Sequence, residues 1–229
     1  MEPLEPGVLE RLRGFDTPTV ANAIEVFNVR PRNEGFMRPE IRCIFPRLGV
    51  MVGHAVTLKI RSAAAPAPGS SIPHPAHWQD VMTVPAPRVV VVEDLDDPPG
   101  LGSFWGEVNA NLHRALGCVG AVTNGSVRDL DQVEPLAFHF FASHIAVSHA
   151  YVHIVEAGGP VCIGGLTVRP GDLLHGDRHG VTSIPLELAA KIAGGVKAVD
   201  TMERQLVNYA QSPEFTLEGL TELWHRLRP

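Results

Sequence analysis

One continuous stretch of this chain constrains its fold more than any other feature. It opens with Arg88–Glu93 (RVVVVE), a run of β-branched residues typical of a strand that is buried on both faces. Gly100–Asp129 then reads, in order, as a glycine-rich loop, a helix with apolar residues at helical spacing, an apolar strand and a loop. Gly117 ends the helix, and Cys118–Thr123 forms the second strand. The order strand, helix, strand predicts a βαβ unit with two parallel strands.

The rest of the chain predicts helices at both ends and short strands after the βαβ unit. Thr17–Phe27 reads as a helix with Thr17 as its N-cap and Pro18 at its first position. Val50–Ser62 alternates as a strand, and short apolar runs between residues 137 and 184 are separated by Gly and Pro. We therefore expect a single α/β domain with mixed sheets over residues 1–229, with N-terminal helices over about 6–28, a core over about 50–185 and C-terminal helices over about 185–227.

The composition excludes several classes of function. The 229 residues are 45% hydrophobic and carry a net charge of −6, and Lys and Arg form no cluster, so nucleic acid is not an expected partner. The longest apolar run is far shorter than the roughly 18–20 residues that cross a bilayer, so no membrane association is expected. The N-terminus is acidic, unlike a secretory signal, which predicts a cytoplasmic location. The three cysteines are far apart and odd in number, which argues against a disulfide framework.

The loop Gly100–Gly106 is the first candidate for chemistry. It lies between a buried strand and a helix, where glycines let a ligand approach the backbone and the free N–H groups of the helix favour an anion. A dinucleotide site is disfavoured, because the glycine spacing is one residue longer than GxGxxG and Asn124 stands where an acidic residue would bind a ribose. Taken alone, the loop predicts only a tight turn without a ligand.

Charged residues at two strand ends make this loop more informative. Glu107 begins the helix that follows the loop, and Arg128 and Asp129 follow the second strand. Because the carboxyl ends of adjacent parallel strands lie side by side, we expect these side chains to surround one helix N-terminus. An arginine and backbone amides suit a small oxyacid, and the aspartate suits a hard divalent cation. The alternative is a surface turn in which Asp129 caps a following helix.

Two motifs resemble a known family. The stretch WGEVNANLHRALGCVGAVTNGSVRD, with Glu107 followed by Arg128 and Asp129, resembles the signature of the RraA-like family, which includes 4-hydroxy-4-methyl-2-oxoglutarate aldolases. A second block, Gly164–Pro185 (GGLTVRPGDLLHGDRHGVTSIP), resembles the same family's segment built on Pro-Gly-Asp and Gly-Val. The resemblance extends from about residue 15 to about residue 205.

The resemblance implies a β/β/α swivelling-type fold, assembled as a homotrimer or as a hexamer of stacked trimers. The implied activity is that of a lyase: a metal-dependent aldolase that cleaves a small 4-hydroxy-2-oxo acid to pyruvate and a carbonyl product, with oxaloacetate decarboxylase activity on the side. The family also includes regulators of ribonuclease activity. A non-catalytic protein-binding regulator is therefore the alternative function, because the two share a fold.

The resemblance also implies roles for the charged residues. Asp129 would ligate Mg²⁺ or Mn²⁺, Arg128 would hold the 2-oxo acid and stabilise the charge on its oxygen, and Glu107 would hold a metal-bound water. Glu203 from a neighbouring subunit would complete the metal site. The sequence departs from the family at Asn124, where Asp is common, and at Glu107, where some aldolases have Asp, so the substrate need not be the methylated oxoglutarate.

The backbone at the helix start would bind the substrate. By the same resemblance, Gly106 and the amides near Val108 and Asn109 would hold its carboxylate. Trp105, beside the glycine loop, would shape the far end of the substrate or else pack into the core.

The lysines offer an independent check on the mechanism. Aldolases avoid a free carbanion with either a lysine Schiff base or a divalent cation. The chain has only three lysines, of which Lys191 and Lys197 fall on the long C-terminal helix and Lys59 on a strand with an expected surface role. A metal route is therefore favoured.

Other titratable residues suggest rival sites. A transition-metal cluster would draw on His139, His144, His149, His153, His175 and His179. The first two differ by an odd number on an extended strand and face opposite ways, so the favoured role of the histidines is in an interface or in hydrogen bonds of the sheet. The acidic cluster Glu93–Asp97 reads as a solvated turn rather than a cation site, and Asp172 and Asp177 read as turn formers.

Overall fold

The computed structural model describes residues 4–5 and 7–227 and divides them into helices and strands as the sequence predicts in outline. Residues 1–3, 6 and 228–229, which include part of the acidic N-terminus and both limits of the predicted domain, lie outside the described residues. The helices are α1 (Val8–Arg13), α2 (Thr17–Glu25), α3 (His74–Thr83), α4 (Glu107–Ala115), α5 (Leu130–Val133), α6 (Ile192–Ala210) and α7 (Leu217–Leu227). The strands are β1 (Arg42–Cys43), β2 (Met51–Arg61), β3 (Arg88–Asp94), β4 (Ser103–Trp105), β5 (Cys118–Val127), β6 (His139–Ile145), β7 (His153–Ala157), β8 (Val161–Ile163), β9 (Leu166–Val168), β10 (Leu173–Asp177) and β11 (Gly180–Ile184).

The predicted βαβ unit forms the centre of a mixed sheet. The strand order is β1-β6-β5-β3-β2-β10-β11, with β4 added beside β5 and β7 beside β2. The neighbours β2, β3, β5 and β6 are parallel, whereas β1, β7, β10 and β11 pair antiparallel. The prediction of a mixed α/β fold is therefore confirmed, and the crossover helix of the unit is α4.

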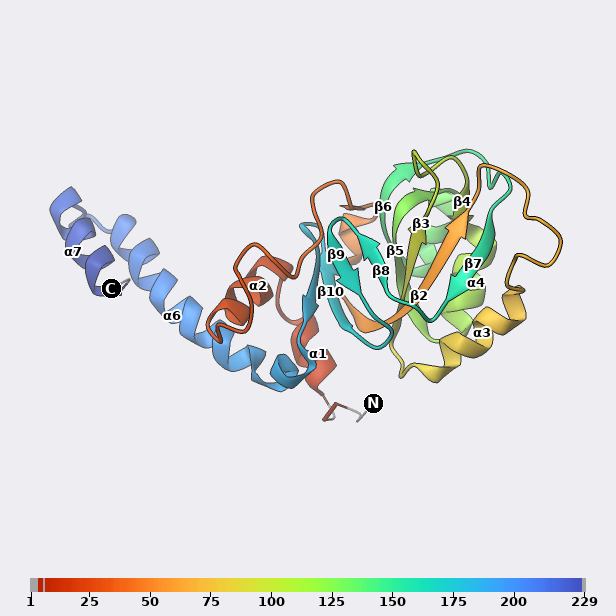
Figure 1. The fold of residues 1–229 in the computed structure, drawn as a ribbon. Helices are drawn as coiled ribbons and strands as arrows, with labels where there is room; N and C mark the ends of the chain where they lie inside the picture. Colours follow the sequence, from red (N-terminus) through yellow and green to blue (C-terminus); the bar gives the residue numbers. More distant parts are fainter. Residues whose placement is uncertain (1–3, 6, 228–229) are drawn as a thin grey trace.

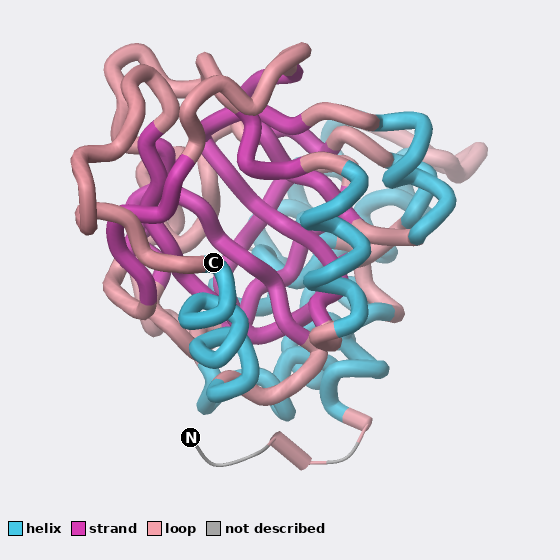
Figure 2. The backbone as a smooth tube through the Cα atoms, turned by 90° about the vertical axis from the view of Figure 1, so that its right-hand side faces the viewer, coloured by secondary structure: helices cyan, strands magenta, loops and turns pink. Residues whose placement is uncertain are grey.

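The sheet curls until it is nearly closed, like a barrel (Figure 2). A side-chain carbon built on Gly176 of β10 would lie 2.9 Å from Cζ of Phe141 on β6, although the two strands are far apart in the strand order. The interior between them is filled by apolar side chains of the central strands and of the β8–β9 hairpin, among them Met51, Ala55, Val91, Val122, Phe141, Val161, Ile163, Leu174 and Val181. Curling thus gives the sheet a core of its own.

Helices α3 and α4 cover the outer face of the same strands (Figure 1). Alternate residues of β2, β3, β5 and β6 point outward, and they pack against Val81 of α3 and Ala110 of α4. These strand residues include Val56, Leu58, Val90, Val92, Ala121 and Phe140. This burial explains why Val89–Val92 in the middle of β3 is apolar without alternation, since both faces of the strand are covered. Each fully buried large aliphatic side chain contributes about 1.5–3 kcal/mol.

A polar network attaches the N-terminal helices to β10. His175, which is fully buried, lies 3.0 Å from the hydroxyl of Thr17 through Nδ1 and 3.1 Å from the carbonyl of Leu12 through Nε2. The N–H of Thr17 donates to Asp177 at 2.9 Å. The N-cap of α2 is Asp16, which accepts a hydrogen bond from Thr19, so the prediction that Thr17 is the cap was wrong by one residue. The N–H and the hydroxyl of Thr17 instead bond to Asp177 and His175 of β10.

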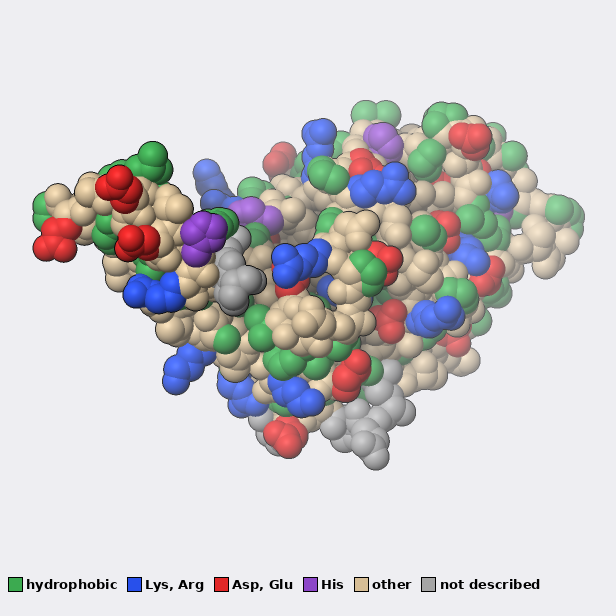
Figure 3. All heavy atoms as spheres, turned by 60° about the vertical axis from the view of Figure 1, so that its left-hand side comes forward, with side chains coloured by type: hydrophobic (Ala, Val, Ile, Leu, Met, Phe, Trp, Pro, Cys, Tyr) green, Lys and Arg blue, Asp and Glu red, His purple; other side chains and the backbone are tan. Residues whose placement is uncertain are grey.

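The C-terminal helices extend away from the sheet (Figure 1). The first part of α6 packs on α2, and its second part continues outward to α7. This projecting end carries acidic and apolar side chains on its surface (Figure 3), and Val207, Phe215 and Leu217 are exposed. Of the helices in the described residues, none has the length and apolar character needed to span a bilayer.

Candidate functional site

The glycine loop is partly a strand, which the sequence analysis did not predict. Ser103 and Trp105 of β4 pair in parallel with Ser126 and Val127, the last residues of β5. The N–H of Arg128 then donates to the carbonyl of Trp105 at 3.0 Å. Because β4 leads directly into α4, this pairing places the residues after β5 against the start of the helix.

Asp129 lies at the N-terminus of α4. Its Oδ2 accepts a hydrogen bond of 3.0 Å from the N–H of Glu107, and Nε of Arg128 lies 3.6 Å from the same oxygen. About a third of each side chain is exposed, 34% for Arg128 and 35% for Asp129. A carboxylate at this position is stabilised by the helix dipole and by the adjacent guanidinium. The structure therefore brings together the three charged residues that the sequence places at two strand ends.

The backbone of Asp129 is unusual for a residue with a side chain. Its φ of 56° and ψ of 44° are left-handed, a conformation that Asp tolerates better than most residues and that often marks functional positions. Asp129 also precedes α5, but its side chain makes no capping hydrogen bond to that helix. The surface-turn alternative, in which Asp129 caps the following helix, is therefore wrong for the side chain, which turns to α4 instead.

Gly106 lets the carboxylate come close to the helix. A side-chain carbon on Gly106 would lie 2.5 Å from Oδ2 of Asp129 and 3.2 Å from Nε of Arg128. A Cβ carbon does not come within 3.0 Å of a non-bonded atom in real structures, so a larger residue here would displace Asp129. The glycine is required by this approach and not by its own backbone angles, which are extended.

Two backbone amides at the helix start have no partner within the helix. The first helical hydrogen bond runs from Ala110 to Gly106, which leaves the N–H groups of Val108 and Asn109 available to a ligand. Val108 is exposed, whereas the side chain of Asn109 turns inward and donates to the carbonyl of Phe104 at 2.6 Å. The side-chain amide of Asn109 is thus occupied, and only its backbone faces the site.

Trp105 does not line the site. Its ring is fully buried and packs against Phe138, Phe140 and His113, with ring centroids 5.7, 6.0 and 4.9 Å away. The prediction that Trp105 contacts the far end of a substrate is therefore corrected, and the core alternative holds. The alternation of β4 turns this side chain into the sheet's outer core, while the carbonyl of Trp105 holds Arg128.

The predicted distal ligand Glu203 lies elsewhere in the chain. It is an exposed residue of α6 and lines two grooves of about 360 and 420 Å³ between α2 and α6, with Asn22 and Val199. Figure 1 places α6 and α4 on opposite sides of the molecule. Within one chain, Glu203 and Asp129 are therefore not neighbours.

The donor set at Asp129 fits a hydrated divalent cation. In the described part of the chain, no hydrogen bond occupies Oδ1 of Asp129, and no cluster of three or more His, Cys, Asp or Glu side chains is arranged as metal ligands. A cation at Asp129 would accordingly take one protein carboxylate and fill its other positions with water, as Mg²⁺ commonly does. The partly exposed position of the side chain allows this.

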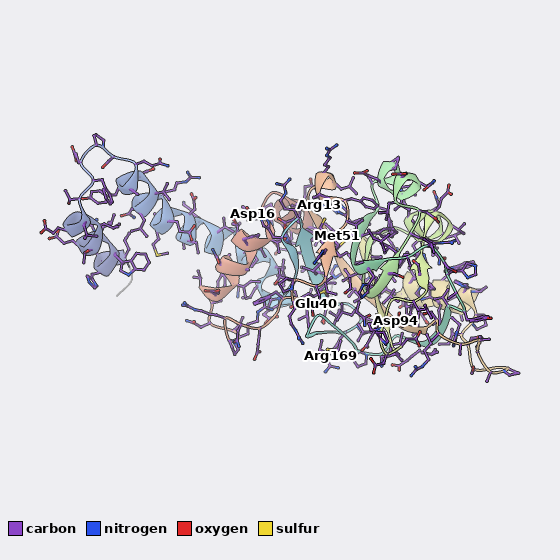
Figure 4. The ribbon with its side chains drawn as sticks, turned by 90° about the horizontal axis from the view of Figure 1, so that it is seen from above. Arg13, Asp16, Glu40, Met51, Asp94 and Arg169 are labelled. Carbon is purple, nitrogen blue, oxygen red and sulfur yellow. The ribbon has the colours of Figure 1, made fainter. Side chains whose placement is uncertain are left out.

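The predicted rival sites have structural roles. Asp94 is buried at the carboxyl end of β3 (labelled in Figure 4) and accepts hydrogen bonds from the N–H groups of Asp96 and Gly100. Burial raises the pKa of this carboxyl group. Asp96 accepts three hydrogen bonds from Ser62 and Ala63, which lower its pKa although partial burial opposes them. The acidic cluster thus closes a loop and is no cation site, but the prediction of a solvated turn was wrong, because Asp94 and the side chain of Asp96 are buried by these hydrogen bonds.

Asn124, one of the departures from the family pattern, belongs to this same region. Its Oδ1 accepts from the N–H of Asp94 at 2.7 Å, and its Nδ2 donates to the carbonyl of Asp94 at 3.0 Å. An amide can make both bonds, whereas a carboxylate can only accept. The sequence gives no signal for this pairing, because it depends on the alignment of β3 and β5.

The histidines of the predicted rival metal site make hydrogen bonds within the protein at separate places. Nδ1 of His149 lies 2.7 Å from the carbonyl of Ala150, and Nδ1 of His153 lies 2.8 Å from that of Tyr151. His175 belongs to the network that holds α2. Two other histidines, His77 and His113, form a buried contact that the sequence analysis missed.

The fold and the site together define an α/β protein that presents a carboxylate, a guanidinium and free amides at the carboxyl ends of parallel strands. The chain belongs to the RraA-like family, whose model, described as Aldolase/RraA, matches residues 17–182. A putative 4-hydroxy-4-methyl-2-oxoglutarate aldolase of Halalkalibacterium halodurans is 33% identical over 81 residues, which are 35% of this chain and 39% of that protein. Protein DlpA of Legionella pneumophila is 20% identical over 88% of this chain. The chain spans only 31% of DlpA's length, so neither match covers two thirds of the curated relative.

Solved structures have the same fold. An uncharacterized protein from Pseudomonas syringae has a TM-score of 0.72 and 25% identity, with 96% of this chain and 95% of that chain covered. RraAS2 of Streptomyces coelicolor, described as an unusual member of the RNase ES inhibitor RraA family, has a TM-score of 0.68 and 18% identity over 89% of this chain and 96% of its own.

Proposed function

We propose that this chain is a divalent-metal-dependent lyase that cleaves a small 4-hydroxy-2-oxo acid to pyruvate and a carbonyl product, and that decarboxylates oxaloacetate as a related reaction. The observation that carries the proposal is the meeting of Asp129, Arg128 and the start of α4 at one point. The similarity of part of the chain to a putative aldolase supports it. We take residues 1–229 as one RraA-like domain that works in the cytoplasm.

The proposed cation is Mg²⁺ or Mn²⁺, held by the Asp129 carboxylate. When bound, such a cation acts as a Lewis acid that withdraws electrons from the 2-oxo group of the substrate. Glu107, exposed at the helix start, would hold water in the cation's hydration shell. Glu107 is exposed and the side chain of Asp129 is partly exposed, which supports a site that a cation enters from solution.

The residues around Asp129 would bind and orient the substrate. The N–H groups of Val108 and Asn109 would donate to its carboxylate, where the positive end of the helix dipole favours an anion. The guanidinium of Arg128 would donate to the 2-oxo oxygen and stabilise the negative charge that develops there as the carbon–carbon bond breaks. As the 4-hydroxyl gives up its proton to water and the bond between C3 and C4 breaks, the far half leaves as an aldehyde or ketone, and a proton returned from water to C3 of the remaining half gives pyruvate.

The positions of the lysines agree with a route that needs no Schiff base. Lys59 on β2 forms an ion pair of 2.9 Å with Glu156. Lys191 and Lys197 lie at the start of and within α6. Helix α6 lies on the side of the molecule away from α4 (Figure 1), and the ion pair with Glu156 occupies Lys59, although β2 ends close to the loop before β4.

The proposed active form is a homotrimer or a hexamer of two trimers, in which Glu203 of a neighbouring copy reaches the metal site. Glu203 would have to come from another copy because α6 and α4 are far apart in one chain (Figure 1). Exposed apolar residues beside the site support an interface there. They lie on two loops joined by the hydrogen bond from Ser103 to Ser148, and they are Leu101, Ile145, Val147 and Tyr151.

The test is release of pyruvate from 4-hydroxy-2-oxo acids and from oxaloacetate, with Mg²⁺, with Mn²⁺ and with EDTA. We expect turnover that depends on the metal and is lost in Asp129→Ala. Asp131→Asn is the matched control, because Asp131 is an exposed acid on α5 two residues away. Absence of metal-dependent turnover on all of these substrates would overturn the proposal and favour a non-catalytic binding regulator.

A further inference from the structure

Two buried imidazole rings face each other between α3 and α4. His77 and His113 are both fully buried, and their Nε2 atoms are 3.0 Å apart. The ring centroids are 5.3 Å apart, so both nitrogens lie near the line that joins the rings. Because the two nitrogens are aimed at each other along this line, a metal ion that both lone pairs ligate would have to lie on it, and the nitrogens would then be about twice a zinc–nitrogen bond of roughly 2.0–2.1 Å apart. The contact is therefore an N–H···N hydrogen bond.

A single carbonyl group fixes the protons of both rings. Nδ1 of His113 lies 2.7 Å from the carbonyl oxygen of Asn109, which can only accept, so this nitrogen carries the proton. In the neutral ring, Nε2 of His113 is then bare and accepts from Nε2–H of His77. That leaves Nδ1 of His77 bare, which agrees with its having no hydrogen-bond partner in the described residues.

This hydrogen-bonded series ends at the candidate site. Asn109, in the first turn of α4, also donates through Nδ2 to the carbonyl of Phe104 at 2.6 Å. Phe104 lies on β4, just before the segment that carries Gly106. The series His77, His113, Asn109, Phe104 therefore ties α3 to the backbone on both sides of the point where Asp129 meets the helix.

Both rings are neutral near pH 7. Burial lowers the pKa of His77 to about 3 and that of His113 to about 4. After burial, the charges that contribute to the lowered pKa values are those of His113, for His77, and of His74 on α3, for both rings. The aromatic rings of Phe104 and Trp105 pack edge-on against His113 and complete its surroundings. Near pH 7 each ring therefore carries one proton, on Nε2 of His77 and on Nδ1 of His113.

We propose that His77 is a positioning residue for the candidate site: acting through His113 and Asn109, it holds the first turn of α4 so that the amides of Val108 and Asn109 stay aimed at the substrate carboxylate. This inference rests on the proposed function for its substrate, but the positioning itself is a property of the chain alone. His77 touches neither the substrate nor the metal. Its effect is on binding more than on the chemical step.

Three variants of the full-length protein test the proposal. His77→Leu removes the donor, His77→Gln retains an N–H group of similar reach, and Gln79→Ala changes an exposed residue of the same helix. Ring-nitrogen NMR of the wild type should show His77 protonated at Nε2 and His113 at Nδ1. Amide hydrogen exchange of Ala110, which makes the first hydrogen bond of α4, should be about tenfold faster in His77→Leu, and near wild type in the other two variants.

Kinetics on the Mg²⁺-loaded protein give the functional readout. We expect His77→Leu to raise KM for the oxo acid about three- to tenfold with little change in kcat, and His77→Gln to restore KM. The proposal is overturned by the opposite tautomers in the wild type, or by unchanged exchange at Ala110 in His77→Leu. It is also overturned by unchanged KM in an active His77→Leu protein. If the wild type has no lyase activity, the proposed function fails, and the NMR and exchange results still decide the positioning role.

Discussion

The carboxylate of Asp129 accepts a hydrogen bond from the backbone N–H of Glu107, although the two residues belong to different elements and are separated by the whole of α4 and β5. The contact joins a left-handed residue after one strand to the first residue of a helix. It leaves Oδ1 of Asp129 without a hydrogen bond among the described residues. A side chain held by one oxygen and open at the other is suited to ligation.

Asp129→Asn separates this hydrogen bond from the charge. The Asn carbonyl can still accept from Glu107, so the local structure should persist, while the negative charge that would hold a cation is lost. We expect kcat for pyruvate release to fall on the order of 100-fold or more, and heat of Mg²⁺ binding to disappear in calorimetry. The thermal midpoint should change by no more than that of Asp131→Asn. Wild-type turnover in Asp129→Asn would remove Asp129 from the metal site.

Gly106→Ala tests the close approach of the carboxylate. The added carbon would lie 2.5 Å from Oδ2 of Asp129, so the carboxylate must move away from the helix start. We expect affinity for Mg²⁺ and for pyruvate to fall about tenfold, measured by calorimetry. Gly194→Ala is the control, because Gly194 lies within α6 and an added carbon there meets nothing within 4 Å. That control should gain about 0.5–1 kcal/mol of stability and bind normally. Equal binding by both variants would contradict the close-approach argument.

The sequence predicts the outline of the site because its elements have strong periodic signals. Val89–Val92 is an uninterrupted apolar run, and α4 has regular apolar spacing, so the βαβ unit and the meeting of its strand ends follow from general geometry. The closeness of Glu107 and Asp129 is a consequence of that geometry. The hydrogen bond between them, in contrast, depends on the left-handed backbone of Asp129, which no local sequence pattern predicts.

Short elements and contacts between distant residues cannot be predicted from the sequence pattern. Ser103–Trp105 is a strand of three residues inside a glycine-rich segment, too short to show alternation, so the inward direction of Trp105 could not be read. The contact of His77 with His113 joins residues 36 positions apart on two helices, and only their packing on the same sheet face brings them together. The pairing of Asn124 with Asp94 likewise depends on tertiary structure, in this case the alignment of β5 with β3.

Stability should fall in mild acid because several histidines are buried neutral. Burial lowers the pKa of His113 and His139 to about 4, against about 6.5 in the unfolded chain. Below pH 6.5 the unfolded chain therefore binds protons that the folded chain does not, so the free energy of unfolding declines as the pH falls toward 4 and is constant above 6.5. We expect a loss on the order of 2 kcal/mol for each such histidine between pH 6.5 and pH 4.5, measured by urea unfolding.

His139→Gln provides the check on this interpretation. The substitution removes one histidine and leaves the His77–His113 pair untouched, so the curve of stability against pH should become shallower by one histidine's share. The carboxylates with lowered pKa values, Asp96 and Asp177, lose their contribution only below about pH 4. Asp94, whose pKa burial raises, takes up its proton first in the folded chain and so opposes the decline, equally in the wild type and in His139→Gln. A wild-type curve that is flat from pH 6.5 to pH 4.5 would contradict the neutral burial of these rings.

Asn124→Asp tests whether the departure from the family pattern is structural. The amide of Asn124 both accepts from and donates to the backbone of Asp94, and it holds β5 to β3 where the regular ladder ends. A carboxylate would keep the acceptor, lose the donor and add a charge beside the buried carboxyl group of Asp94. We expect a loss of about 1–3 kcal/mol at pH 7, and a smaller loss at pH 5, because the neighbouring Asp94 carboxyl group raises the pKa of the new Asp, and its neutral form can donate. Chemical unfolding at both pH values measures the difference. A loss that is equal at the two pH values would mean that the bond from Nδ2 contributes little, and that the geometry of the strand ends is maintained by β4 and the parallel ladder instead.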